Sequence, residues 1–452
     1  MAQHYELAVI GSGSGGREAA LLGAQKGLRT ALIERAGIGG SCFHRGCYAV
    51  RTLQACARQF RDSWKSGRFG NRIDLLETTL SDWMTAQRNV AARLVDNFRA
   101  QLERLNVDLI HGHGEFLDHR TLRVTGAQGS IITADNFIIA TGSRPDFRHS
   151  SHPRMTNSDG LLRISTLPSR FAVVGAGYIG CEFASIYRTL GSEVTLIEKA
   201  NRVLPGWEPE AGDRVAEALE IRGVKIVLNH EVAFNEIEES EPGIRIPGHR
   251  GADVDADLVL MATGRRPNSE ELGLKALGID DSSALQVDQR MRVASPGPYA
   301  VGDVTGISLL DSTAFAQASV AVHSILGQET SFEQRWAPRC IHTQPTVATV
   351  GWTEEEAASK SIEFAIASDS MRLASDDERS VVDPEPTFVK AIIDSRTRNL
   401  LGCLVVGDHA AVIANIASIA IRLKAPVDQL RETPLAQPSA ADALMAVLRK
   451  LD

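Results

Sequence analysis

The sequence predicts an α/β protein that begins with two similar βαβ units and ends in a smaller α+β domain. An apolar strand, a glycine-rich turn, a helix and a second apolar strand follow one another at Leu7–Arg35, and again at Phe171–Lys199. From about Ser331 onward, short apolar segments alternate with turns, and the glycine-rich pattern does not recur. These observations together predict three kinds of folded segment in one chain.

The composition limits the classes of partner. The chain has 452 residues, enough for two to four domains. Its net charge of −8 argues against a nucleic-acid partner, and its six cysteines are too few for a disulfide scaffold. The first residues lack the pattern of a signal peptide, and no run of 18 apolar residues could span a membrane. We therefore expect a cytoplasmic protein with no nucleic-acid or membrane partner.

The first repeat carries a dinucleotide-binding pattern. Gly11, Gly13 and Gly16 form G-x-G-x-x-G, and Glu34 ends the next strand, 23 residues after the first glycine. The first glycine permits a sharp turn, the second lets the backbone approach a pyrophosphate, and the third lets helix and strand pack closely. The amides of the helix start would hold the phosphates, and the acid would bind the ribose hydroxyls.

The second repeat has the same pattern at the same spacing. Gly175, Gly177 and Gly180 form its glycine triad, and Glu198 follows the first of them by 23 residues. One triad alone is a weak signal, because an ordinary turn between a strand and a helix can contain it. Two triads, each after an apolar strand and each with its acid, predict two Rossmann-like dinucleotide-binding domains. Two dinucleotides in one chain suggest electron transfer between them.

Two cysteines five residues apart follow the first repeat, in GGSCFHRGCYAVR from Gly39 to Arg51. A zinc site would need two more ligands, and the sequence offers no second Cys/His cluster, so we expect no metal site. A static disulfide is also disfavoured in a reducing compartment. We therefore predict that Cys42 and Cys47 form a redox couple. Cys47 would begin a helix, whose start stabilises a thiolate.

Three further segments suit the connections between two dinucleotide domains. The apolar strands in FIIATGSRP (Phe137–Pro145) and LVLMATGRRPN (Leu258–Asn268) each run into a Thr-Gly turn. The segment YAVGDVTG (Tyr299–Gly306) places Asp303 at the end of a strand. There its carboxylate could accept hydrogen bonds from a ribityl chain.

The remaining segments are predicted to supply core and interface. Between Arg51 and Leu105 we expect amphipathic helices that pack as ordinary core. After Ser331, TVATVGW, FVKAIID and LLGCLVVG are typical of antiparallel strands, and Ala410–Ala425 of a buried helix. This last domain carries no phosphate-binding loop.

In this order, the motifs resemble those of the class I pyridine nucleotide-disulfide oxidoreductases, the family of dihydrolipoamide dehydrogenase, glutathione reductase and mercuric reductase. The resemblance covers essentially the whole chain. It implies FAD on the first repeat, NAD(H) rather than NADP(H) on the second, and a homodimer formed through a C-terminal α+β dimerisation domain. The implied domains are 1–145 (FAD, first part), 146–264 (NAD), 265–331 (FAD and central domain, second part) and 332–452 (dimerisation).

The resemblance also implies roles around the redox couple. Cys47 would lie nearest the flavin. Cys42 would be the exposed thiol that exchanges with a disulfide or dithiol substrate, either a small molecule or a group borne on a protein. Arg51 stands where the family usually carries a lysine that approaches the flavin and pairs with a glutamate, here Glu182. Tyr178 corresponds to a tyrosine that covers the nicotinamide pocket until the cofactor enters.

The implied cofactor contacts extend beyond the glycines and acids. Glu198 favours NADH because a carboxylate accepts from the ribose 2′-hydroxyl and repels a 2′-phosphate. The expected FAD contacts are Gly11, Gly13, Gly16, Glu34, Arg35, Gly40, Ser41, Arg51, Gly114, Thr141, Gly142, Ser143, Asp303, Leu310 and Asp311. The expected nicotinamide-cofactor contacts are Gly175, Gly177, Tyr178, Ile179, Gly180, Glu198, Val232, Ala262 and Gly264.

One segment near the end departs from the family pattern. Relatives acting on dithiols carry a HAHPTLSE-like segment, whose second histidine is the acid-base catalyst and is oriented by the glutamate. The aligned stretch is LAQPSAAD, in which Gln437 replaces the histidine and Asp442 the glutamate. Glutamine cannot exchange a proton near neutral pH. His342 and His409 are possible substitute bases, although each is more simply read as an ordinary polar residue.

We therefore expect an FAD-dependent enzyme similar to dihydrolipoamide dehydrogenase, with an unusual acceptor. Two alternatives stay open: a reductase of metal ions, quinones or oxygen, which needs no thiol base, and a non-catalytic redox sensor or partner.

Overall fold

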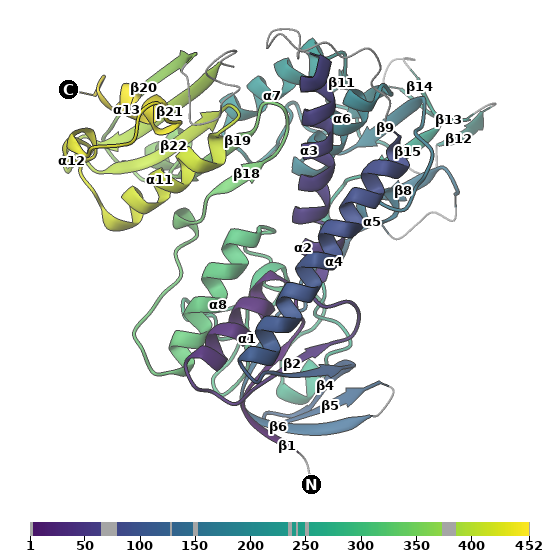
Figure 1. Ribbon diagram of the computed structural model, residues 1–452, viewed down its shortest axis with the longest axis vertical. Coiled ribbons are helices and arrows are strands. Elements are labelled where there is room, and N and C mark those ends of the chain that lie inside the picture. Colours follow the sequence, from purple (N-terminus) through teal and green to yellow (C-terminus); the bar gives the residue numbers. More distant parts are fainter. Residues whose placement is uncertain are drawn as a thin grey trace. The chain divides into compact units, whose positions relative to one another are not determined.

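The computed structural model describes residues 3–64, 79–126, 129–147, 152–233, 237–240, 243–248, 253–372 and 386–451 (Figure 1). The chain divides into two compact units. Unit 1 comprises Met1–Thr52, Met84–Asp146 and Gly264–Gln334, and unit 2 comprises Leu53–Trp83, Phe147–Thr263 and Arg335–Asp452. No helix in the described part of the chain has both the length and the apolar character that crossing a bilayer requires.

Unit 1 is built on a mixed sheet whose central strands are parallel. Strand β1 (Gln3–Ile10) lies between β2 (Thr30–Glu34) and β6 (Ser130–Ile139), and pairs in parallel with both. The strand order among the described residues is β3-β2-β1-β6-β5-β4, and β17 also pairs with β6. The outer strands are β3 (Asp108–His111), β4 (His113–Asp118), β5 (Thr121–Thr125) and β17 (Tyr299–Ala300).

Both faces of β1 are covered, which explains its uninterrupted apolar run. Leu7 and Val9 pack in the cluster that contains α1 (Ser14–Gln25) and α8 (Asp311–Ile325), two helices that lie side by side (Figure 1). Ala8 and Ile10 point to the opposite face and pack with residues of β4, β5 and the short helix η4 (Leu274–Leu277). The first predicted βαβ unit is therefore confirmed.

The predicted helices after Arg51 are present. They are α3 (Cys47–Trp64), which begins at the second cysteine of the predicted couple, and α4 (Leu80–Arg104). The boundary between the two units falls within both helices. Residues 65–78, which the prediction also included, lie outside the described residues.

Unit 2 repeats the βαβ arrangement. Strand β9 (Arg170–Val174) leads into α6 (Tyr178–Leu190) and then β10 (Glu193–Ile197). The parallel sheet has the order β11-β10-β9-β15-β8, completed by β8 (Met155–Asn157), β11 (Lys225–Val227) and β15 (Leu258–Met261). A small antiparallel sheet, β12-β13-β14, contains β12 (Glu238–Ser240), β13 (Gly243–Ile246) and β14 (Val254–Ala256). The helix α7 (Pro209–Ile221) follows β10 in the chain.

The last part of unit 2 contains the predicted antiparallel strands. Its sheet has the order β18-β19-β22-β21-β20, in which every pairing is antiparallel. The strands are β18 (Arg339–Ile341), β19 (Val347–Gly351), β20 (Phe364–Met371), β21 (Thr387–Asp394) and β22 (Leu400–Val406). Helix α11 (Ala410–Leu423) packs on β19 and β22, and α13 (Ala441–Leu448) packs on β20 and β21 (Figure 1).

The prediction that Ala410–Ala425 forms a buried helix is only half right. Ala410, Ile413, Ala414, Ala417 and Ala420 of α11 are buried against the sheet. In the structure of this single chain, however, Val412, Ile419 and Leu423 are 52%, 61% and 72% exposed. The sequence predicts a fully buried helix here because both faces of the helix carry apolar side chains.

A buried ion cluster joins the two parts of unit 2. Lys390 on β21 is 5% exposed, and its Nζ lies 3.0 Å from a carboxylate oxygen of Glu210 on α7 and 2.6 Å from one of Glu354, the first residue of α9 (Glu354–Ser359). It also contacts the carboxylate of Glu208, which precedes α7. Burial opposes the charge of Lys390, but the three carboxylates outweigh burial and raise its pKa.

We predict that Lys390→Met destabilises unit 2 strongly, because it removes the buried cation that three carboxylates share, although Glu210 keeps an ion pair with Arg214 at 3.0 Å. Breaking a buried ion pair on one side costs about 3–5 kcal/mol, which corresponds to a fall in melting temperature of at least about 6 °C. Thermal unfolding followed by circular dichroism measures this. Lys450→Met is the matched control, because Lys450 and Asp369 form an exposed pair at 2.6 Å, typically worth below about 1 kcal/mol. Equal melting temperatures for the two variants would contradict the prediction.

Candidate redox and dinucleotide site

The first glycine triad makes a close turn and leaves open space at its centre. Gly11 has φ +99°, and a Cβ there would lie 2.4 Å from the carbonyl oxygen of Ala140. A Cβ on Gly16 would lie 1.8 Å from the carbonyl oxygen of Gly11. No atom lies within 4 Å of the Cβ position of Gly13, which directly precedes α1. Tight packing at the outer glycines and free space at the middle one fit a pyrophosphate at the helix start.

The second triad has the same geometry. Gly175 has φ +103°, and a Cβ there would lie 2.5 Å from the carbonyl oxygen of Ala262. A Cβ on Gly180 would lie 1.9 Å from the carbonyl oxygen of Gly175, whereas the Cβ position of Gly177 is open. Ala262 therefore closes the second turn as Ala140 closes the first. The residues present fit a dinucleotide at both turns.

The acid of the first repeat is oriented by backbone amides. Oε2 of Glu34 accepts hydrogen bonds from the backbone N of Ser12 at 2.9 Å and from its hydroxyl at 2.6 Å. Oε1 accepts from the amide of Ala36 at 2.8 Å. The carboxylate is buried, so these bonds fix its position beside the glycine turn.

The acid of the second repeat is held in the same way. Oε2 of Glu198 accepts from the amide of Ala176 at 2.7 Å, and Oε1 accepts from that of Ala200 at 2.9 Å. Carboxylate oxygens have further lone pairs, so both acids can still accept from ribose hydroxyls. The sequence indicated the acids and their spacing, but not the amides that orient them.

The segment that carries the cysteines lies against the first glycine turn. The hydroxyl of Ser12, which donates to Glu34, also accepts from the amide of Gly39 at 2.9 Å. A Cβ on Gly40, the first residue of α2 (Gly40–His44), would lie 2.7 Å from Cα of Gly13. The predicted redox couple and the predicted phosphate site are therefore neighbours within unit 1.

Cys42 and Cys47 lie close together as free thiols, and a carboxylate faces them. The sulfur atoms of both cysteines and a carboxylate oxygen of Asp311 all lie within 4.8 Å of one another. Sγ of Cys42 donates to Oδ1 of Asp311, the first residue of α8, at 3.6 Å. Cys42 is buried and Cys47 is exposed, which corrects the expectation that Cys42 is the exposed thiol. Asp311 was expected as an FAD contact, and its contact with Cys42 was not predicted.

The structure adds influences on Cys47 that the sequence did not indicate. Cys47 does begin α3, as predicted. The hydrogen bond with the Cys42 thiol and burial, followed by the charges of Cys42 and Asp311, raise the pKa of Cys47. A helix start favours a thiolate weakly, while a sulfur and an anion within a few ångström oppose it more strongly.

The three-residue group offers two sulfur donors and one carboxylate donor. In the part of the chain that the structure describes, no fourth His, Cys, Asp or Glu joins it. A closed structural zinc site needs four protein ligands. The arrangement therefore resembles a redox pair with an adjacent acid more than a structural metal site.

Asp303 lies in the 3₁₀ helix η5 (Gly302–Thr305) and not at the end of a strand, which corrects the sequence prediction. The backbone turns after β17 at Gly302, which has φ +78° and directly precedes Asp303. The Ser143 hydroxyl donates to Oδ2 of Asp303 at 2.5 Å and accepts from Nε of Arg265 at 2.8 Å. Burial raises the pKa of Asp303, and these two partners oppose that rise. Asp303 thus has partners within unit 1 before any ribityl chain is considered.

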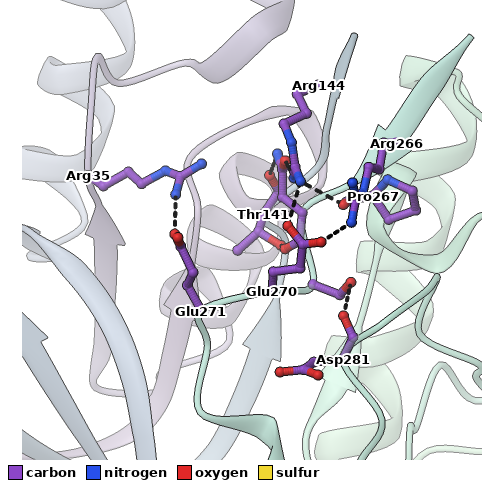
Figure 2. A network of polar contacts seen from close by, with 10 residues as sticks. Arg35, Thr141, Arg144, Arg266, Pro267, Glu270, Glu271 and Asp281 are labelled. Carbon is purple, nitrogen blue, oxygen red and sulfur yellow. Dashed lines mark hydrogen bonds and ion pairs between the residues drawn. The ribbon is translucent and has the colours of Figure 1, made fainter. Parts of the chain in front are cut away.

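A polar network holds the two Thr-Gly turns together (Figure 2). The short strands β7 (Ser143–Pro145) and β16 (Arg265–Pro267) pair antiparallel. Arg144 donates to Oδ1 of Asn268 at 2.7 Å and to Glu270 at 2.5 Å, and Arg266 contacts the same glutamate. The hydroxyl of Thr141 donates to the carbonyl of Asn268 at 2.7 Å. The repeated R-P after each Thr-Gly turn was a signal for this pairing that the sequence analysis did not use.

The other expected FAD contacts lie in unit 1. Arg35 is exposed and lies 4.0 Å from Glu271 (Figure 2). The remaining ones are Ser41 on α2, Gly114 on β4, Gly142 in the first Thr-Gly turn, and Leu310 directly before α8. Arg51 is exposed on α3.

The expected nicotinamide-cofactor contacts lie mostly in unit 2. Tyr178 and Ile179 open α6, and Val232 is buried after β11. Glu182 is buried on α6, where its Oε1 accepts from the amide of His342 at 2.7 Å. Gly264 is the exception, because it belongs to unit 1. Arg51 also belongs to unit 1 whereas Glu182 belongs to unit 2, so the Arg51–Glu182 pair stays a prediction.

The altered C-terminal segment keeps one feature of the expected arrangement. Nε2 of Gln437 donates to Oδ1 of Asp442 at 3.3 Å, and the amide of Ser439 donates to Oδ2 at 3.1 Å. Gln437 is exposed. The two residues that replace the family's histidine and glutamate are therefore in contact. Gln437, in the position of the histidine, carries an amide, which cannot exchange a proton near neutral pH.

Two family models match the chain. Residues 5–324 match one described as pyridine nucleotide-disulphide oxidoreductase, and residues 337–447 match the dimerisation domain of the same family.

Curated relatives align over nearly the full length. Dihydrolipoyl dehydrogenase from Chlamydia trachomatis is 30% identical, over 99% of this chain and 98% of that protein. Dihydrolipoyl dehydrogenase 2 from Haloarcula marismortui is 31% identical, over 97% and 95%.

Solved structures are similar over the whole chain as well. LpdA from Mycobacterium tuberculosis superposes with a TM-score of 0.90 at 26% identity, covering 100% of both chains. A Cu(II) complex of RclA, an HOCl-induced flavoprotein disulfide reductase from Escherichia coli, gives a TM-score of 0.86 at 26% identity, also covering 100% of both.

We predict that the middle and last glycines of the second triad respond differently to alanine. Gly177→Ala places a methyl group in open space, so the protein should fold and retain its flavin. The methyl group would occupy the space where the backbone approaches the pyrophosphate, so the affinity for NADH should fall at least about tenfold. Gly180→Ala forces a methyl group against the Gly175 carbonyl, so it should lower the melting temperature by several degrees. Thermal unfolding and equilibrium titration with NADH separate the two effects. Unchanged NADH affinity in Gly177→Ala would contradict the assignment of this turn.

Proposed function

Because the chain belongs to the pyridine nucleotide-disulphide oxidoreductases, a family of FAD-dependent disulfide oxidoreductases, we propose that it passes electrons from NADH through FAD and the Cys42–Cys47 couple to an acceptor other than a small disulfide. The observation that carries this proposal is the placement of the two sulfur atoms, within 4.8 Å of each other on a segment that lies against the first glycine turn. When bound, FAD supplies the two-electron chemistry that links the nicotinamide to the disulfide.

The residues proposed to hold FAD share unit 1 with the couple. Gly13 leaves space for the pyrophosphate, Glu34 is oriented to accept from the ribose, and Asp303 supplies a carboxylate for the ribityl chain. Cys47 is proposed to be the sulfur nearest the flavin, and Cys42 the sulfur that meets the substrate. The domain assignment proposed from the sequence, with FAD at 1–145 and 265–331, is compatible with this arrangement.

NADH is the proposed electron donor in preference to NADPH. Glu198 has the same amide-held orientation as Glu34, with its carboxylate beside the second glycine turn. A carboxylate fixed there accepts from a ribose 2′-hydroxyl and repels a 2′-phosphate. Tyr178, at the start of α6, is proposed to cover the nicotinamide pocket.

In the reverse direction, in which a dithiol returns two electrons to the oxidised couple, thiol-disulfide exchange gives each cysteine a separate part. A sulfur of the reduced substrate, as thiolate, attacks Sγ of Cys42, so a mixed disulfide forms and the Cys42–Cys47 bond breaks. Cys47 leaves as a thiolate. A second substrate sulfur then attacks the first, releasing Cys42 as a thiolate and closing the substrate disulfide, so the substrate loses two electrons and the couple gains them. The proton of each attacking thiol must be accepted, and Gln437 cannot accept it.

A second candidate function is reduction of quinones, oxygen or metal ions. Such acceptors need no base to activate a thiol, which suits an amide at position 437. The related RclA has been solved as a Cu(II) complex. An acceptor panel with NADH as donor distinguishes this candidate from reduction of disulfides.

We further propose a homodimer formed through the last domain, the segment that matches the family's dimerisation domain. The outer face of α11 supports this, because Val412, Ile419 and Leu423 are spaced for one stripe of a helix and are exposed in the single chain.

The first prediction from this proposal separates the two half-reactions. NADH should reduce the flavin rapidly, because that step does not involve the altered base. Dihydrolipoamide should reduce the flavin slowly, at a rate that increases with pH. A positioned base contributes about 10²–10⁴-fold. Gln437→His with Asp442→Glu should therefore recover at least about tenfold of the dihydrolipoamide rate. Stopped-flow absorbance with each reductant, between about pH 6 and 9, measures both.

The outcomes of this experiment are distinct. Slow reduction of the flavin by both NADH and NADPH would refute the proposed function. Fast oxidation of dihydrolipoamide by the unmodified protein at neutral pH would show that a free dithiol is a substrate after all. His342→Ala and His409→Ala would then identify the substitute base.

The second prediction concerns assembly. Val412→Lys combined with Ile419→Lys should convert the dimer into a monomer at micromolar concentration, because two charges would be buried in the apolar interface. Light scattering coupled to gel filtration measures the mass. Ile221→Lys on α7 is the control, since Ile221 is also an apolar residue of unit 2 and is 78% exposed. A dimer that survives the double substitution would place the interface elsewhere.

A further inference from the structure

A thiol and an imidazole lie side by side in unit 2, away from the Cys42–Cys47 couple. Cys340 lies on β18, and His342 directly follows that strand. Side chains alternate along an extended strand, so these two face the same side, while Ile341 between them is fully buried. Sγ of Cys340 and Nδ1 of His342 are 3.6 Å apart, and both side chains are half-buried.

The backbone that carries this pair is held from two directions. Cys340 is opposite Ala348 on β19, and β19 itself lies between β18 and β22. The amide of His342 donates to Oε1 of Glu182 on α6 at 2.7 Å. Glu182 is 9% exposed, and a hydrogen bond shielded from water in this way is stronger than one at the surface. The thiol and the imidazole therefore meet on a backbone that the sheet and α6 both fix.

The other cysteines outside the couple have different surroundings. Cys181 and Cys403 are buried, and Cys56 is half-buried on α3. Burial raises the pKa of all three thiols. Among the described residues, no imidazole is hydrogen-bonded to any of these three sulfur atoms. Cys340 therefore differs from them in having a base beside its sulfur.

We propose that Cys340 is a modification site at which a hydroperoxide oxidises the thiol, and that this oxidation slows the reduction of the flavin by NADH. The effect on NADH rests on the proposed function, because it concerns the step in which NADH delivers its electrons. The reactivity of the thiol does not depend on that function.

The imidazole supplies what a cysteine needs in order to react. A cysteine attacks as its thiolate, and a neighbouring histidine generates the thiolate by accepting the S–H proton and then pairs with the anion. The ordinary pKa of histidine is about 6.5, so the neutral ring that accepts a proton is available at pH 7. At 3.6 Å from Sγ of Cys340, Nδ1 of His342 can accept that proton without movement of the backbone.

The oxidation step balances with the hydroperoxide as the oxidant. The Cys340 thiolate attacks one oxygen, so an S–O bond forms and the O–O bond breaks. The leaving oxygen takes the proton held by His342 and departs as water or an alcohol. The sulfur loses two electrons, the peroxide gains them, and the product is a sulfenic acid. A small thiol can then attack that sulfur and release water, which begins the return to the free thiol.

The charges around the pair favour an uncharged reagent. The carboxylate of Glu182, which the His342 amide holds nearby, would repel an anionic oxidant. Arg339, directly before Cys340, places its cation over the ring of Trp207 at 4.2 Å from the centroid. Its charge is therefore already engaged in unit 2. Hydrogen peroxide and small alkyl hydroperoxides are uncharged and small enough for a half-buried thiol.

Oxidation of Cys340 would act on Glu182 through His342. A sulfenic acid is larger and more polar than a thiol, so the imidazole must move to accommodate it. Because the amide of the same residue donates to Glu182, this movement disturbs the buried carboxylate. Glu182 is the residue proposed to pair with Arg51 near the flavin. A displaced carboxylate there would slow the transfer of the hydride from NADH.

The first test measures the reactivity of Cys340 directly. The flavin-loaded protein is kept oxidised, and iodoacetamide labelling of each cysteine at pH 7 is quantified by peptide mass spectrometry. Cys340 should label at least about tenfold faster than Cys56, because the rate follows the thiolate fraction and one pKa unit is tenfold. Cys56 is the matched control, since it is also a half-buried cysteine of unit 2. His342→Gln, which removes the base, should abolish most of the difference, and His342→Ala is the second variant.

The second test measures the effect of oxidation on the flavin. After treatment with hydrogen peroxide, stopped-flow absorbance follows the reduction of the flavin by NADH. The rate should fall at least about tenfold, since a displacement of about 1 Å near the reacting atoms can cost about 10²-fold. Incubation with a small thiol should restore the rate. Cys340→Ala should reduce its flavin at the same rate before and after peroxide, and Cys340→Ser is the alternative if the alanine variant does not fold.

Each contrary result removes a defined part of the inference. Equal labelling of Cys340 and Cys56, or unchanged labelling in both His342 variants, would overturn the reactivity of the pair. Equal rates of flavin reduction before and after peroxide would overturn its link to Glu182, as would an equal loss of rate in the Cys340 variants. Failure of NADH and NADPH to reduce the flavin of the untreated protein would count against the proposed function, whereas the labelling rates still decide the reactivity of Cys340.

Discussion

The rest of each dinucleotide unit depends on one close approach, in which the third glycine of the triad lies directly against the carbonyl of the first. A methyl group at Gly16 or Gly180 would come within 2 Å of that oxygen. This contact brings the helix start to the end of the strand and exposes its amides. In unit 1 it also sets the position of Ser12, whose hydroxyl connects Glu34 to the segment that carries Cys42.

Much of the fold could be predicted because its determinants are local. The apolar strands, the glycine spacing and the acids of both repeats are contiguous in sequence, and the structure has them as expected. The pairing of β7 with β16 could not be predicted in the same way, because Ser143 and Pro267 are far apart in the chain. The exposed stripe on α11 was missed for a different reason. Apolar residues on both faces of a helix give no periodic signal for which face meets solvent.

The sequence indicated the residues of the candidate site more fully than the electrostatic effects among them. The spacing of Cys42 and Cys47 was sufficient to predict a couple, and Cys47 does begin a helix. The effect of that helix start on the thiol could be inferred locally, but the opposing carboxylate comes from a residue distant in sequence. Asp311 was expected to contact the flavin, and nothing in the sequence around it indicated a thiol partner. Arg265 and Asn268 were missed because their partners lie across the two Thr-Gly turns.

The ion cluster around Lys390 restricts the order in which this sequence can change over evolution. Three acids from the start of α7 and the start of α9 meet one lysine of β21. Losing the lysine first leaves the acids to repel one another around a buried position, whereas losing one acid leaves the other two with their shared cation. Substitution of the lysine is therefore accessible only after the acids have gone, so the four positions are expected to vary together among homologues.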